Sequence, residues 1–178
     1  MNTKLIVGLG NIGQEYNSTR HNIGFIILDY LSTQYNVTFS TNKKIDGFIC
    51  SFYVGSTKCI LLKPATYMNK SGTAVFQTMQ YFKICLDDMI VFHDDIDLVL
   101  HKIRIRNGGG NGGHKGLRSI SESCGNNYIK VGYGVDRPRN SVSVSDYVLQ
   151  KFDFNTLNEI NTRIHENFSS IESILDLK

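Results

Sequence analysis

The chain has 178 residues, of which 41% are hydrophobic and 20% are charged, and its formal net charge is +3. This composition excludes a disordered chain, and the length suits a single domain over residues 1–178 with a core of its own. No apolar run is long enough for a membrane span or a signal-peptide core, so we expect a cytoplasmic protein without a membrane partner. The four cysteines are scattered without a C-x-x-C pair, which is typical of free thiols in a reducing compartment.

Hydrophobic periodicity and turn residues predict strands and helices in rough alternation, with one hairpin. This order indicates an α/β fold: a single domain with a mixed, mostly parallel twisted central sheet flanked by helices. In the first half of the chain we expect a strand from Lys4 into the glycines at 8–10, a loop at 14–20, a helix to Tyr35 with Asn22 as its possible N-cap, and hairpin strands at 47–54 and 58–63. A helix through Val75, Met79 and Phe82 and a strand at 89–93 follow. In the second half we expect strands at about 102–106 and 129–135, with a glycine loop and a helix at 117–123 between them, then a short helix at 146–149 and a C-terminal amphipathic helix from Phe154 to Leu175.

Positive charge is concentrated in one part of the chain. Residues 102–139 hold eight basic and two acidic residues, a net of +6, whereas the whole chain carries only +3. Such segregation suits a local face that binds phosphate groups on an otherwise near-neutral body. A solvated basic face without a partner remains the alternative.

A glycine loop lies in the middle of this basic stretch. Six of the ten residues from Asn107 to Gly116 are glycine. Glycine permits positive φ and close backbone approach, but ordering so many glycines costs conformational entropy, so we interpret the loop as a binding surface for an anionic group. The P-loop pattern G-x-x-x-x-G-K-[ST] is absent because Gly116 follows Lys115, which argues against a nucleotide triphosphatase.

The segment Gly8–Gly13 matches the dinucleotide fingerprint G-x-G-x-x-G directly after a strand. Its context does not fit, because residues 14–20 are polar and aperiodic where the fingerprint requires the start of a helix. An oxidoreductase that binds a nicotinamide cofactor is therefore a weaker alternative. Absence of NAD(H) binding would reject it.

Acidic residues gather at the predicted end of the strand at 89–93, in His93-Asp94-Asp95-Ile96-Asp97. Strand carboxyl ends are where α/β proteins place their sites. Three roles are open for these carboxylates: binding a hard cation, capping a turn, or orienting a histidine from elsewhere in the chain. His21 precedes a predicted helix, and sequence spacing alone does not bring it to Asp94.

Six segments taken together carry a more specific signal: Val7–Asn11, Tyr16 with Thr19–Gly24, Lys63–Gly72, His93–Asp97, Gly108–Leu117 and Val131–Gly134. In order and spacing, over nearly the whole chain, they resemble bacterial peptidyl-tRNA hydrolase. That resemblance implies hydrolysis of the ester between peptide and terminal ribose in peptidyl-tRNA, which recycles tRNA released early from ribosomes. It implies no metal, no cofactor, a monomer, and peptidyl-tRNA as the partner.

The resemblance also assigns catalytic roles. His21 matches the family's general base, which activates a water molecule, and Asp94 matches the carboxylate that orients this histidine. Asn11 matches a cleft asparagine that places substrate and water. A histidine with a pKa near neutrality suits a base at physiological pH, and an ester has a good leaving group.

Substrate contacts follow in the same way. Tyr16 matches a cleft tyrosine, and Asn69 with Met68 would hold the peptide backbone. An asparagine carries both a donor and an acceptor, so it can bind a backbone regardless of the side chains. His114 and Lys115 would contact the substrate from the glycine loop.

Two basic residues, Arg106 and Lys130, fall where the family grips the tRNA 5′ phosphate. The chain departs from the family pattern at Lys115, where asparagine is usual, and at Ile12, where proline is usual. Lys115 would either stabilise an oxyanion by charge or turn to solvent and leave that role empty. In the second case the chain would be an RNA-binding module that has lost catalysis.

Overall fold

The computed structural model describes residues 2–139 and 141–175. They form one seven-stranded mixed sheet with strand order β2-β3-β4-β1-β5-β7-β6. The four central strands β4, β1, β5 and β7 are parallel, and the outer pairs β2/β3, β3/β4 and β6/β7 are antiparallel. The predicted α/β fold with a mixed central sheet is confirmed.

The elements have the following bounds. The strands are β1 Thr3–Gly8, β2 Ser40–Asn42, β3 Ile45–Val54, β4 Thr57–Pro64, β5 Met89–Asp95, β6 Ile103–Asn107 and β7 Ile129–Gly134. The α-helices are α1 Ile23–Gln34, α2 Ser71–Phe82, α3 Lys115–Cys124, α4 Val144–Val148, α5 Phe154–Glu166 and α6 Phe168–Leu175. Short 3-10 helices are η1 Gln14–Tyr16, η2 Arg20–Asn22, η3 Met68–Lys70 and η4 Leu86–Asp88.

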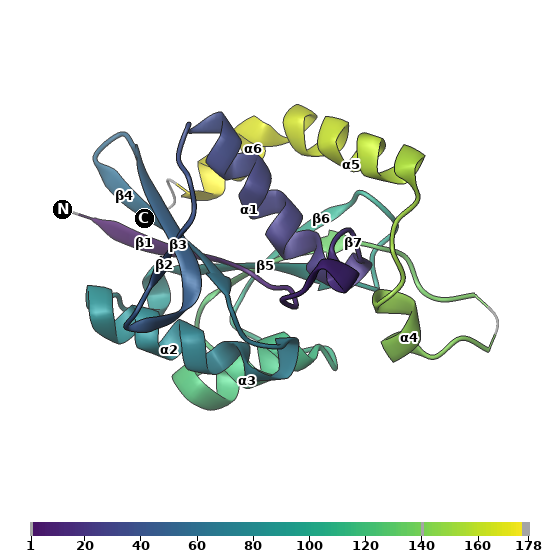
Figure 1. The fold of residues 1–178 in the computed structure, drawn as a ribbon, viewed down its shortest axis with the longest axis horizontal. Helices are drawn as coiled ribbons and strands as arrows, with labels where there is room; N and C mark the ends of the chain where they lie inside the picture. The colour runs from purple at the N-terminus through teal and green to yellow at the C-terminus, as the bar shows by residue number, and fades with distance from the viewer. Residues whose placement is uncertain (1, 140, 176–178) are drawn as a thin grey trace.

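Helices cover both faces of the sheet, as Figure 1 shows, with α1, α5 and α6 on one face and α2 and α3 on the other. Each face of the sheet carries its own hydrophobic core, because successive side chains of a strand point to opposite faces. On β5, Ile90 and Phe92 pack in the core beneath α1, whereas Met89 and Val91 pack in the core beneath α2 and α3. Burial of these two apolar layers fixes the register of the central strands.

Two local predictions need correction, and one strand was missed. The C-terminal segment forms two helices, α5 and α6, because Asn167 takes a non-helical φ of −94° and ψ of 8° between them. The side chain of Asn22 does not cap α1, because it is used elsewhere, as described below. The short edge strand β2 was not predicted, since three polar residues carry no apolar alternation.

The glycines after β1 serve packing in this fold. A Cβ on Gly8 would lie 2.4 Å from the carbonyl oxygen of Gly24, so the strand end and α1 touch only because both residues lack side chains. A 3-10 turn, η1, follows Gly13, so no α-helix opens there. The dinucleotide-binding alternative therefore lacks the helix that it requires.

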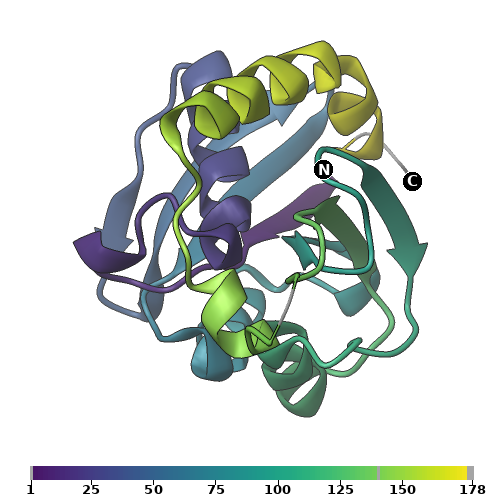
Figure 2. The ribbon, with the colours of Figure 1, turned by 90° about the vertical axis from the view of Figure 1, so that its right-hand side faces the viewer.

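The carboxyl ends of the parallel strands meet at one edge of the sheet, and α4 lies beside this edge in Figure 2. The turn containing Asn11 follows β1, Met68 and Asn69 follow β4, and Asp94 lies at the end of β5. Among the residues described, no helix is both long and apolar enough to cross a membrane.

Candidate active site

A cleft of about 680 Å³ opens at this edge of the sheet. Nine of the ten residues predicted as site residues line it: Asn11, Tyr16, His21, Met68, Asn69, Asp94, Arg106, His114 and Lys115. They come from five separate parts of the chain, 11–21, 68–69, 94, 106 and 114–115, and the sheet brings these parts together. The tenth residue, Lys130, does not line the cleft.

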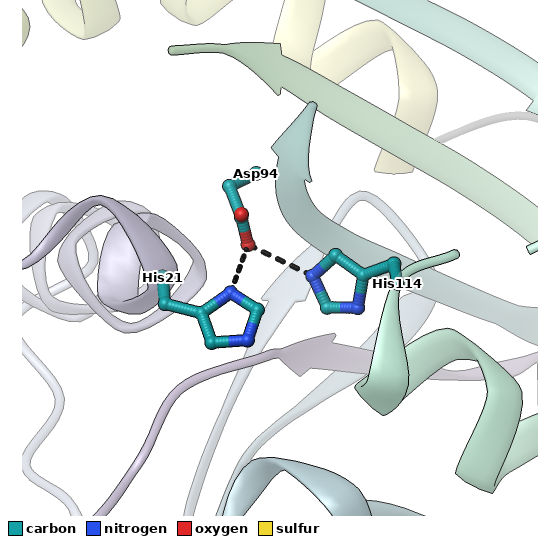
Figure 3. A group of neighbouring side chains, drawn as sticks. All are labelled: His21, Asp94 and His114. Atoms are coloured by element: carbon teal, nitrogen blue, oxygen red, sulfur yellow. Dashed lines mark hydrogen bonds and ion pairs between the residues drawn. The ribbon is translucent and has the colours of Figure 1, made fainter. Parts of the chain in front are cut away.

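Two histidines share one buried carboxylate at the cleft floor, as Figure 3 shows. His21 Nδ1 and His114 Nε2 each lie 2.8 Å from Asp94 Oδ1. The side chain of Asp94 is only 2% exposed, and those of His21 and His114 are 10% and 8% exposed. The contact between His21 and Asp94 that sequence spacing left open is therefore present.

The protonation of this cluster follows from its partners. Burial alone would raise the pKa of Asp94, but His21 and His114 outweigh burial and hold that pKa well below its usual range. An ionised carboxylate only accepts hydrogen bonds, so both facing ring nitrogens donate. His114 Nδ1 in turn accepts from the backbone N–H groups of Gly116 and Leu117 and so caps α3. His21 is left with its lone pair on Nε2, the ring nitrogen directed away from Asp94 in Figure 3.

The same three side chains bring possible metal ligands within 4.8 Å of one another. Their hydrogen bonds argue against a metal site. A neutral His114 bound to a metal through Nε2 would carry its proton on Nδ1, where two backbone N–H groups of α3 already donate. Metal binding would therefore remove the N-cap of α3 as well as both bonds to Asp94, so the cluster fits a hydrogen-bonded base better than a metal centre.

Asn11 is fixed by a residue that the sequence analysis did not assign to the site. Asn22 Oδ1 accepts from the backbone N–H of Asn11, and Asn22 Nδ2 donates to the Asn11 carbonyl, both at 2.9 Å. Asn11 Oδ1 then accepts from the backbone N–H of Met68 at 2.8 Å. This arrangement leaves the Nδ2 of Asn11 as its donor toward the cleft. The only sequence signal for Asn22 was its place beside His21, which we interpreted as a helix cap.

The mouth of the cleft is more exposed than its floor. Asn69 is exposed on η3, next to the buried Met68. Tyr16 is half-buried and packs edge-on against Tyr67, with ring centroids 6.4 Å apart. One side of the cleft comes from α4 and its flank, through Val144, Val148 and Leu149, which the sequence analysis did not assign.

Comparison with known proteins gives the family. The family model described as peptidyl-tRNA hydrolase matches residues 5–178. The chain belongs to the peptidyl-tRNA hydrolase family. A peptidyl-tRNA hydrolase of Rickettsia canadensis (strain McKiel) is 44% identical over 173 residues, which cover 97% of this chain and 94% of that protein. One of Rickettsia bellii (strain RML369-C) is 47% identical over 170 residues, covering 94% of this chain and 92% of that protein.

Solved structures of the peptidyl-tRNA hydrolase family have the same fold. The crystal structure of the enzyme from Acinetobacter baumannii superposes with a TM-score of 0.90 at 34% identity, covering 98% of this chain and 89% of that chain. A 5′-methylthioadenosine nucleosidase of Arabidopsis thaliana, at a TM-score of 0.59 and 5% identity, is similar in fold alone.

The two basic residues at which the peptidyl-tRNA hydrolase resemblance implied a phosphate grip lie in different environments. Arg106 is half-buried on β6 and lines the cleft. Lys130, on the neighbouring strand β7, is 0% exposed, and its ammonium donates to backbone carbonyls. The side chain of Lys130 points under the glycine loop rather than into the cleft.

Lys115, the departure from the peptidyl-tRNA hydrolase pattern, is the first residue of α3 and is exposed at the cleft. A neighbouring ion pair joins Arg104 to the buried Asp95, with Arg104 Nη2 lying 2.6 Å from Asp95 Oδ2. Asp95 follows Asp94 on β5, so its side chain points to the opposite face of the sheet. The acidic cluster seen in the sequence is thus divided between a histidine partner and an arginine partner.

Proposed function

We propose that this chain hydrolyses the ester bond between peptide and tRNA in peptidyl-tRNA, with His21 as the general base. The observation that carries the proposal is the contact between His21 Nδ1 and the ionised, buried Asp94 in a cleft that Asn11 also lines. Asp94 accepts from Nδ1 and so fixes the tautomer of His21 with the lone pair on Nε2, as a carboxylate does in hydrolytic triads.

The reaction follows from the positions of these groups. His21 Nε2 takes a proton from water, and the water oxygen attacks the ester carbonyl carbon. The carbonyl oxygen becomes an oxyanion, toward which Asn11 Nδ2 donates, because Asn11 Oδ1 is held by the backbone N–H of Met68. The bond from the carbonyl carbon to the ribose oxygen then breaks, and the proton on Nε2 passes to that ribose oxygen.

Substrate binding would fall to two groups of cleft residues, one polar and uncharged and the other basic. Asn69 and the backbone around Met68 would hold the peptide backbone, and amide groups accept any peptide sequence. Tyr16, which packs against Tyr67 next to these residues, would contact the substrate from the same side. Arg106 and Lys115, which both line the cleft, would supply the positive charge for tRNA phosphates. We further propose that the chain works as a single-domain monomer in the cytoplasm, without metal or cofactor.

The test is release of an N-acetylated amino acid from its charged tRNA, in EDTA, by wild type and His21→Ala. Wild type should release the amino acid, and His21→Ala should be slower by about 10²- to 10⁴-fold, the range for loss of a general base. Binding of uncharged tRNA should persist in the variant, because His21 contributes no phosphate contact.

His165→Ala is the matched control, since His165 is exposed on α5 and bonds Tyr30 outside the cleft. It should behave as wild type. Loss of tRNA binding together with activity in His21→Ala would mean that His21 is structural. No release by wild type, with tRNA still bound, would favour the RNA-binding module without catalysis.

A further inference from the structure

We propose that Arg20 is a positioning residue that holds α4, the helix forming one wall of the cleft, at a fixed place beside the proposed base His21. Arg20 lies in η2 directly before His21. Its loss should loosen this wall and so weaken substrate binding. The kinetic part of the inference rests on the proposed function, whereas its structural part can be measured in the free protein.

The wall depends on contacts from other parts of the chain. Val144, Val148 and Leu149 form the apolar lining on this side of the cleft. The helix itself has only five residues, which is too short for a helix to be stable alone. Val144 is 43% exposed and Leu149 is 41% exposed, so these two side chains bury only part of their surface. Attachments to neighbouring segments therefore decide where α4 lies.

Backbone contacts join the segment after α4 to the residues that precede the catalytic histidine. The backbone N–H of Arg20 donates to the Gln150 carbonyl at 3.2 Å. Thr19 and Lys151 form an isolated antiparallel β-bridge. The segment 149–153, which leads from α4 to α5 (Figure 1), is thus held against η2 whatever the side chains are.

The side chain of Arg20 adds an attachment to α4 itself. Its Nη1 donates to the Gln150 carbonyl at 3.2 Å, and its guanidinium carbon lies 4.3 Å from the centroid of the Tyr147 ring. The centroid of the Phe152 ring is 5.2 Å from the same carbon. Both distances are those of cation–π contacts. Tyr147 is also held at its other end, because its hydroxyl donates to the Val135 carbonyl at 2.7 Å.

The charge of Arg20 serves this attachment rather than an ion pair. Within residues 2–139 and 141–175, no carboxylate lies at ion-pair distance from Arg20. Arg20 is also not among the residues that line the cleft. A guanidinium is planar, so it can lie against an aromatic ring and donate a hydrogen bond as well. These contacts fit a residue that acts on the substrate through α4.

The effect should appear in binding rather than in the chemical step. His21 has an anchor of its own, because its Nδ1 is bonded to Asp94. Removal of the Arg20 side chain leaves this bond and the backbone contacts of η2 in place. Only α4 loses a contact, so we expect KM to change and kcat to stay near the wild-type value.

Arg20→Gln tests the attachment in the free protein, and Arg163→Gln is the matched control for loss of one positive charge. Arg163 is exposed on α5, where it pairs with Glu166. Amide hydrogen exchange of residues 147–150 should be about 10-fold faster in Arg20→Gln and unchanged in Arg163→Gln. The amides of β5 should be unchanged in both variants. Wild-type exchange of residues 147–150 in Arg20→Gln would overturn the proposal.

Hydrolysis of an N-acetylated aminoacyl-tRNA gives the second readout. KM should rise about 3- to 10-fold in Arg20→Gln, with kcat within about 2-fold of wild type, and Arg163→Gln should rise less. A fall in kcat without a rise in KM would mean that Arg20 acts on His21 instead of α4, which would overturn the proposal.

Tyr147→Leu tests the route, because it removes the ring against which Arg20 lies. Since the two residues are in contact, Arg20→Gln should raise KM by about 2-fold at most when Tyr147 is already replaced. Full additivity of the two substitutions would overturn the proposal. Amide exchange requires neither tRNA nor turnover, so failure of the proposed hydrolase activity would be seen separately.

Discussion

The floor and the mouth of the cleft are built in different ways. At the floor, His21, Asp94 and Asn11 are buried, and each is held by a hydrogen bond at 2.8 Å. At the mouth, Asn69 and Lys115 are exposed on turns that precede or begin helices. The groups at the floor are therefore held in a fixed orientation before any substrate arrives, whereas the groups at the mouth can adjust to the substrate.

This difference matches the tasks that we propose for the two regions. Proton transfer requires atoms within hydrogen-bond reach and a fixed tautomer, which a buried network supplies. A peptide of arbitrary sequence requires tolerance, which exposed amide and basic groups supply. Substitutions at the floor should thus change kcat or stability, and substitutions at the mouth should change binding by smaller amounts.

The largest effect should come from Asp94→Asn. An amide has no negative charge and can turn its Nδ2 donor toward a histidine, so it no longer fixes the tautomer of His21 or stabilises its protonated form. The kcat should therefore fall on the order of 10³-fold. The measurement is single-turnover release from charged tRNA. Asp95→Asn is the neighbouring control, because Asp95 pairs with Arg104 rather than with a histidine, and it should have a much smaller effect on kcat. Equal losses in both variants would mean that Asp94 acts only through folding.

A smaller effect concerns the stability of the floor. Burial, with a contribution from His114, lowers the pKa of His93 to about 4. Between pH 6.5 and 4, His93 is protonated in the unfolded chain but stays neutral in the folded chain. The free energy of unfolding is therefore highest above pH 6.5 and decreases as the pH falls below it. The loss should reach about 3 kcal/mol near pH 4. The depressed pKa of Asp94 adds a separate loss only below its ordinary value, near pH 4.

Urea unfolding at several pH values between 4 and 7.5 measures this dependence. His93→Gln does not titrate there and should show a flatter curve, whereas the exposed-site control His165→Gln should keep the wild-type curve. Curves of equal slope for wild type and His93→Gln would show that the buried histidine does not control acid stability.

The smallest effect should come from Lys115→Asn at the mouth, which restores the residue usual in the family. Lys115 is exposed, so unfolding free energy should change by less than about 0.5 kcal/mol. If Lys115 stabilises the oxyanion by charge, kcat should drop severalfold; if it only attracts tRNA, KM should rise at low salt with kcat unchanged. A rise in kcat would show that lysine impairs the site. Lys115 would then affect the chemical step, as the residues of the cleft floor do, rather than binding.

Prediction from sequence succeeded for features that depend on neighbouring residues in the chain, such as helices, hairpin turns and the ends of strands. Periodicity located α1, and Gly55-Ser56 located the hairpin between β3 and β4, because both depend on nearby residues. The acidic run after Met89 indicated a site at a strand end. Prediction failed where a side chain is used across the fold, as for Asn22, which was expected to cap α1. Its partner Asn11 is 11 residues away, and no local rule connects the two.

By itself, the sequence determined the α/β class, the family resemblance and nine of the residues that line the cleft, because composition, periodicity and motif order are properties of the chain. Only the tertiary structure decided which histidines share Asp94 and on which nitrogen each carries its proton. It also decided that Lys130 faces inward. These outcomes depend on which polar groups are buried together, and a buried ion or amide takes whichever partners the packed strands place within reach.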